Sequence, residues 1–218
     1  MKASQRSLEL DPELAEAHAA RGLAVSLDEQ YAEAEQAFEQ AIRLNPKLFE
    51  AYDFYARACQ VQGKYERAAE LFEKAAEVRP EDFQALALLG SVFRAMNRKA
   101  EAEAAQRDAH GRAKKHLELN PDDARALYLG ATGLLSLGER EQAFEWAQRA
   151  LSIDPDDAHV LYNVACVYAL AGKVNDGLQY LERSVDAGFA FKGWIERDSD
   201  FESIRHHPRY RTLLDKLD

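Results

Sequence analysis

The tetrapeptide Leu44-Asn45-Pro46-Lys47 recurs in related form along this chain of 218 residues. The residue before a proline disfavours the helical region, and proline suits the first turn of a helix, so the phrase predicts one helix ending and another beginning. The prolines of its five versions are separated by 34, 34, 41 and 34 residues, which indicates an internal repeat. The other four versions of the phrase are Leu10-Asp11-Pro12-Glu13, Val78-Arg79-Pro80-Glu81, Leu119-Asn120-Pro121-Asp122 and Ile153-Asp154-Pro155-Asp156.

Each unit between prolines divides into two helices. In the second unit, small and apolar residues recur at helical spacing from Phe49 to about Gln62, Gly63 interrupts the pattern, and a second stripe runs from Ala68 to Val78. Gly138 and Gly172 take the place of Gly63 in the last two units. Small residues also recur on the second helices, where they allow two helices to approach closely. These sets are Ala34/Phe38/Ala41, Ala68/Phe72/Ala75 and Ala143/Ala147/Ala150.

This pattern resembles the tetratricopeptide repeat, in which a small residue on helix A is followed by a break, an aromatic residue, and alanines and a proline along helix B. The resemblance implies an all-α fold, a right-handed superhelical solenoid of antiparallel helix pairs with a C-terminal helical cap. We expect five units at residues 15–48, 49–82, 83–123, 124–157 and 158–187. Residues 1–14 would form a partial or capping helix, and residues 188–218 the cap.

Three places depart from the repeat. The third unit is seven residues longer, which predicts an elongated second helix from Lys99 to Leu119, either a tolerated insertion of two turns or a protruding partner surface or hinge. Within residues 1–14, Ala3 to Leu10 match only the later part of a helix B. We expect either a lone capping helix or a chain cut from a longer array, and self-association through this half-helix.

The third departure is the end of the chain, where the repeat stops near Asp186. We expect two short helices there, one opened by Asp200 and one capped by His207 before Pro208, whose aromatic residues cover the last repeat. The stretch from Asp198 to Tyr210 resembles the tails that follow tetratricopeptide arrays in bacterial signalling proteins, including multidomain kinases and nucleotide cyclases.

The sequence offers no set of residues for catalysis, a metal or a cofactor. The six histidines form no zinc-type spacing, and Cys59 and Cys166 fall in different A helices, where small buried residues are expected. Asp122-Asp123 and Asp156-Asp157 follow the prolines and complement helix N-termini. A net charge of −10 argues against nucleic-acid binding, and the absence of a long apolar stretch argues against membrane insertion. We therefore expect a non-enzymatic, cytoplasmic protein.

What remains is an interaction surface. In a tetratricopeptide array the A helices line a concave groove, and helical spacing places positions two, five, nine and twelve of each repeat on that face. Tyrosine and arginine contribute strongly at interfaces. The expected function is non-catalytic binding of a peptide or helix of a partner protein. The alternative is an accessory segment of a larger bacterial kinase or cyclase that docks to its own catalytic domains. The candidate partner-binding residues are Asp53, Arg57, Arg94, Arg125, Tyr128, Tyr162 and Asn163.

Overall fold

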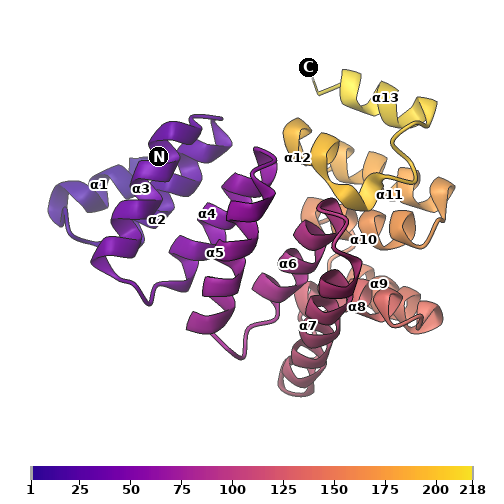
Figure 1. Ribbon diagram of the computed structural model, residues 1–218. Helices are drawn as coiled ribbons and strands as arrows, with labels where there is room; N and C mark the ends of the chain where they lie inside the picture. The colour runs from indigo at the N-terminus through magenta and orange to yellow at the C-terminus, as the bar shows by residue number, and fades with distance from the viewer. Residues whose placement is uncertain (1, 218) are drawn as a thin grey trace. The chain divides into compact units, whose positions relative to one another are not determined.

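The computed structural model describes residues 2–217, with side chains from residue 6 onward. Within this range the chain is helical, contains no strand, and divides into two compact units, residues 1–81 and 82–218 (Figure 1). Unit 1 contains α1 (Lys2–Leu10), α2 (Ala15–Leu27), α3 (Tyr31–Leu44), α4 (Phe49–Val61) and α5 (Tyr65–Val78). The expected all-α arrangement of stacked helix pairs is confirmed.

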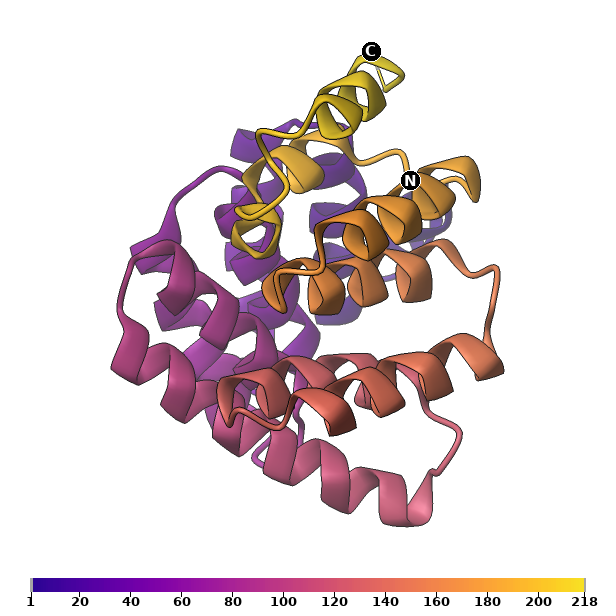
Figure 2. The same cartoon turned by 90° about the vertical axis from the view of Figure 1, so that its right-hand side faces the viewer.

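Unit 2 contains three further helix pairs and the C-terminal segment (Figure 2). The pairs are α6 (Gln84–Ala95) with α7 (Lys99–Leu119), α8 (Ala124–Ser136) with α9 (Arg140–Ile153), and α10 (Ala158–Leu170) with α11 (Val174–Asp186). The segment that follows holds α12 (Lys192–Arg197), the 3-10 turn η1 (Ser199–Phe201) and α13 (Pro208–Asp215). The long helix α7 covers the residues that the sequence predicts, and its alanine stripe is buried.

The helices of a pair are joined by a tight turn whose key residue has a positive φ. Gly63 takes φ 75°, and Gly138 and Gly172 are similar, as expected from their position in the repeat. In the first and third pairs, Glu29 and Asn97 occupy this left-handed conformation instead, at φ 59° and 58°. A glycine is therefore not required for the turn, although it removes the steric penalty.

The A helices begin a few residues after the prolines, and not at the prolines themselves. The prolines lie in the turn before each A helix, and the helix begins three or four residues later. Asp123 and Asp157 are the N-caps of α8 and α10, where their side chains accept hydrogen bonds from backbone N–H groups. The two aspartates therefore act by direct capping as well as through the helix dipole.

Packing within a pair depends on a small residue facing a large one. Phe38 is fully buried, and a Cβ at Gly22 would lie 2.6 Å from its ring. In the third pair Gln106 takes the place of the aromatic residue. It is buried, donates a hydrogen bond to the Ala87 carbonyl at 2.8 Å and accepts one from Thr132 at 3.0 Å. The stacking of α6, α7 and α8 therefore includes a satisfied polar contact in the core.

The end of the chain differs in part from the prediction. His207 caps α13 as expected, its ring nitrogen accepting from the Arg209 N–H. The helix expected to begin at Asp200 is wrong: that residue lies within the single turn η1, which Asp198 caps, and the preceding helix α12 was not expected. Phe189, Ile195, Phe201, Ile204 and Tyr210 are buried with α10 and α11 in one hydrophobic cluster.

Candidate interaction surface

The A helices of unit 2 form one continuous face. Helix α8 packs against both α6 and α10, so inward side chains of the three helices share this side of the unit. The turn η1 contacts both α10 and α6, so the chain after α12 folds back onto this face (Figure 1). The inner face of unit 2 therefore already holds a segment of the same chain.

Acidic side chains fasten this segment. Arg94 on α6 donates a hydrogen bond to Asp200 Oδ1 at 2.7 Å, and the hydroxyl of Tyr162 on α10 donates to Asp198 Oδ2 at 2.6 Å. The Ser199 hydroxyl also donates to the Ser91 carbonyl at 3.3 Å. Arginine and tyrosine side chains of the inner face thus bind carboxylates that lie two residues apart.

Aromatic rings pack around the same contacts. Phe189 stacks on Tyr162 with ring centroids 4.2 Å apart, and Phe201 meets the Tyr162 ring edge-on at 5.4 Å. Such offset and edge-to-face pairs stabilise beyond the area that they bury. The segment is therefore held by a polar contact at each carboxylate and by a buried phenylalanine that follows them.

The buried charges of this region do not balance. Burial and the neighbouring Asp200 raise the pKa of Asp198 to about 6. Burial together with Asp198 also raises the pKa values of Tyr162 and Cys166, so both side chains are neutral near pH 7. Arg94 supplies positive charge to two carboxylates. The groups that face the Asp198 carboxyl are Tyr162, Cys166, Arg94 and Asp200, and Arg205 donates to the Asp198 backbone carbonyl.

Cys166, Asp198 and Asp200 bring a thiol and two carboxylates within 4.8 Å of one another. These are ligand types that bind metal ions. Here, however, each carboxylate already accepts a hydrogen bond, from Tyr162 or Arg94, and the Cys166 thiol lies 3.8 Å from Asp198 Oδ2. The chemistry of this cluster is therefore that of a polar contact between the segment and the helices.

The remaining candidates in unit 2 lie apart from this contact. Arg125 is exposed and donates to Gln84 Oε1 at 2.8 Å. Tyr128 is buried, at 6% exposure, within the core of α7 to α10. Asn163 is half-buried and donates to the His159 carbonyl one turn earlier on α10. The structure thus brings Arg94 and Tyr162 together, and the partner-binding roles of all these residues stay predictions.

In unit 1, Asp53 and Arg57 lie one turn apart on α4. The Arg57 Nε donates to Asp53 Oδ2 at 2.8 Å. Asp53 is only 3% exposed, and among the described residues its Oδ1 has no hydrogen-bond partner. A buried carboxylate oxygen without a donor is costly. The pair therefore combines a half-buried guanidinium with an unused acceptor on an A helix.

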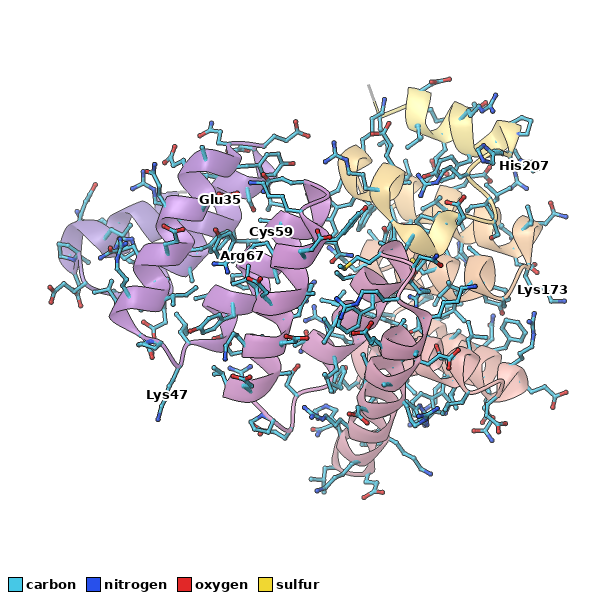
Figure 3. All side chains as sticks on the ribbon, viewed as in Figure 1. Glu35, Lys47, Cys59, Arg67, Lys173 and His207 are labelled. Atoms are coloured by element: carbon cyan, nitrogen blue, oxygen red, sulfur yellow. The ribbon has the colours of Figure 1, made fainter. Side chains whose placement is uncertain are left out.

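A second buried thiol lies in unit 1 between α3, α4 and α5. Figure 3 labels Cys59 beside Glu35 and Arg67. Burial and the nearby Glu35 raise the pKa of Cys59 to about 11, so it remains a thiol at neutral pH. Because the thiolate is the nucleophile, this site favours a structural role. Both cysteines are buried as the sequence predicts.

Sequence reasoning identified Arg94 and Tyr162 but missed Asp198 and Asp200, the groups that contact them. The available signal was the Asp-Ser-Asp-Phe stretch after the last repeat, with two carboxylates on alternate residues and an aromatic residue next to them. That stretch indicated only a cap, because the contact between Arg94 and Asp200 spans 106 residues and no local rule links them.

Comparisons with known proteins agree with this architecture. Tetratricopeptide repeat family models match residues 27–90 and residues 107–158. A search of curated proteins gave no match. None of the helices within residues 2–217 is long and apolar enough to cross a membrane.

Solved structures similar to this chain share little of its sequence. TTC0263, a thermophilic TPR protein of Thermus thermophilus, is 18% identical, with a TM-score of 0.61 over 93% of this chain and 98% of its own. PilF of Pseudomonas aeruginosa is 18% identical, with a TM-score of 0.55 over 94% of this chain and 89% of its own. YrrB, a TPR protein with an unusual peptide-binding site, is 22% identical, with a TM-score of 0.49 over 85% of this chain and 92% of its own.

Proposed function

Because the chain is a tetratricopeptide repeat protein, a class of protein-interaction module, we propose that it binds a peptide or helix of a partner protein on the inner face of its A helices. The observation that carries the proposal is the segment on α6 and α10, where inner-face arginine and tyrosine side chains hold two carboxylates and a phenylalanine. This surface has the chemistry of peptide recognition, since polar side chains that fix orientation lie beside an aromatic ring that packs against an apolar group.

In unit 1 the proposal assigns the same role to Asp53 and Arg57. The partly exposed Arg57 guanidinium is a donor for a carboxylate or carbonyl, and the buried Asp53 carboxylate beneath it fixes its orientation. In unit 2, Arg125 supplies an exposed guanidinium on α8. Arginine is enriched where binding energy concentrates at interfaces, so these positions are suitable for substitution.

A selection of random peptides on the purified full chain tests the proposal. The affinity of each selected peptide is then measured by fluorescence anisotropy for Arg57→Gln and Arg125→Gln. The matched controls are Arg43→Gln on α3 and Arg107→Gln on α7, which make the same change at exposed positions on B helices. We expect inner-face substitutions to weaken binding about tenfold, as an energetically important contact does. Selected peptides that bind all four variants equally would refute inner-face binding.

The other function considered, docking to catalytic domains of the same polypeptide, stays a prediction. It requires that the native reading frame encode such a domain beside this array. Sequencing the genomic locus decides that requirement directly.

A further inference from the structure

The turn η1 is seated on α6 and α10 through side chains. Asp198 and Asp200 reach Tyr162 and Arg94, and Phe201, the last residue of the turn, is fully buried against Tyr162 and the cap residue Tyr210. The turn itself has only three residues, and it lies between α12 and the irregular stretch that precedes α13. The inner face of the helices therefore orders this segment together with the rest of the cap, in which Arg205 donates to the Asp198 carbonyl and Tyr210 packs against Phe201.

The polar contacts between this segment and the inner face are not fully paired. The buried carboxylate of Asp200 and the half-buried carboxylate of Asp198 face one guanidinium, and their oxygens lie within 4.8 Å of each other and of the Cys166 sulfur. The Arg94 Nε, moreover, has no hydrogen-bond partner among the described residues. Like charges at close range repel, and an unpaired buried donor is costly, so the polar contacts hold the internal segment only weakly. A segment that makes the same contacts in trans can therefore exchange with it.

The apolar contacts of the segment, in contrast, stabilise it on the inner face. Phe201 would lose its burial if the turn left the inner face, and exposing a phenylalanine side chain is unfavourable. A competing ligand therefore has to supply an aromatic ring of its own as well as the two carboxylates. These demands define the ligand: two acidic residues separated by one residue, followed directly by an aromatic residue.

We propose that residues 198–201 are an internal ligand of the unit 2 inner face, and that a partner segment of the form acidic-x-acidic-aromatic displaces them. The proposal rests on the proposed function, since it names the ligand and the regulation of that surface. In the free protein the face is closed by the chain's own Asp-Ser-Asp-Phe stretch. Binding in trans opens it, so the internal segment lowers the apparent affinity for every such partner.

A labelled synthetic peptide with the sequence of residues 196–203 is the probe. Fluorescence anisotropy measures its affinity for the full chain and for Asp200→Asn, which weakens the internal ligand and leaves Arg94 and Tyr162 in place. The matched control is Glu202→Gln, which removes an exposed carboxylate from the same segment. We expect Asp200→Asn to bind at least tenfold more tightly than the unmodified chain and Glu202→Gln to bind equally to it.

Two further measurements assign the gain to this site. Adding Arg94→Gln to Asp200→Asn should abolish the gain. A peptide in which only the second aspartate, the counterpart of Asp200, is replaced by asparagine should bind at least tenfold more weakly, because it loses the ion pair with Arg94. An Asp200→Asn protein that keeps its circular dichroism and tryptophan fluorescence but shows no gain would overturn the inference. If peptides from the random selection still depend on the inner-face arginines, the proposed function survives that result.

Hydrogen exchange on the unmodified chain gives a test that needs no variant. An exchangeable segment opens without unfolding the helices beneath it. We expect the amides of Phe201 and Arg205, which donate within this segment, to be at least tenfold less protected than the amide of Val164 in the middle of α10. Equal protection would mean that the segment is a permanent part of the core, and the inference would fail.

Discussion

Replacing Asp198 with asparagine is expected to stabilise unit 2 at neutral pH and to remove part of its pH dependence. Burial and Asp200 raise the pKa of this carboxyl from 3.8 to about 6 in the folded protein. Folding therefore favours the protonated form. The contribution of Asp198 to stability is fully present below pH 3.8 and is lost as the pH rises through about 6.

The size of the effect follows from the shift. A difference of about two pKa units corresponds to about 3 kcal/mol of lost stability at pH 7.5. Asparagine carries no charge but keeps one acceptor oxygen where Asp198 uses two, for the Asp200 N–H and the Tyr162 hydroxyl. Losing one such bond costs about 1 kcal/mol, so the variant should be about 2 kcal/mol more stable at pH 7.5 and no more stable at pH 4.

Urea denaturation monitored by tryptophan fluorescence measures the change in the stability of unit 2. The two tryptophans of the chain, Trp146 and Trp194, both lie in unit 2. An increase of about 2 kcal/mol should move the midpoint at pH 7.5 by about 1 M urea. Glu196→Gln, which removes an exposed carboxylate two residues away, is the control. If the Asp198→Asn and unmodified curves stay parallel from pH 4 to 7.5, the charge imbalance assigned to this region is wrong.

Three other changes test the packing and the polar contacts. In urea denaturation at pH 7.5, Arg94→Gln should destabilise unit 2 by about 3 kcal/mol, since it leaves the two carboxylates without their cation. Adding Asp198→Asn to that variant should restore part of the lost stability. Gly130→Ala should lower the free energy of unfolding by about 1–3 kcal/mol in the same assay, because the new Cβ would lie 2.4 Å from the Trp146 ring. Gly111→Ala, whose Cβ would have no atom within 4 Å, should raise it by about 1 kcal/mol. Equal effects of the two substitutions would contradict the close approach of Gly130 to Trp146. Asp157→Ala should cost about 1 kcal/mol of thermal or urea stability through loss of the α10 N-cap, while the exposed neighbour Asp156→Ala should change little.

The helix pairs follow from rules that act over a few residues. The proline phrase separates successive pairs, and Gly63 suits the left-handed turn within a pair. Ala34, Phe38 and Ala41 are buried as their spacing predicts. Where the turn residue is Glu29 or Asn97, no glycine marks the break, and the repeat period alone indicates it. Periodic sequence was sufficient because each pair needs only its neighbours to bury its apolar side.

Only part of the candidate surface could be predicted from the sequence. Helical spacing placed Arg94 and Tyr162 on the A-helix face, but it left Asp198 and Asp200 without an assignment and placed a helix where one turn exists. Hydrophobic residues such as Phe201 indicated a cap, because aromatic residues after the last repeat have an exposed face to cover. The contact of the cap with the inner face could not be predicted in this way, because it joins side chains that are far apart in the sequence.

The amino-acid sequence by itself therefore determined the repeat period and the helix pairs, since spacing and turn chemistry are local properties of the chain. Only the tertiary structure decided what covers that face in unit 2. Joining Asp200 to Arg94 requires the chain to return from the last helix pair to the third, and the free energy of that return comes from burial and charge that exist only once the pairs have stacked.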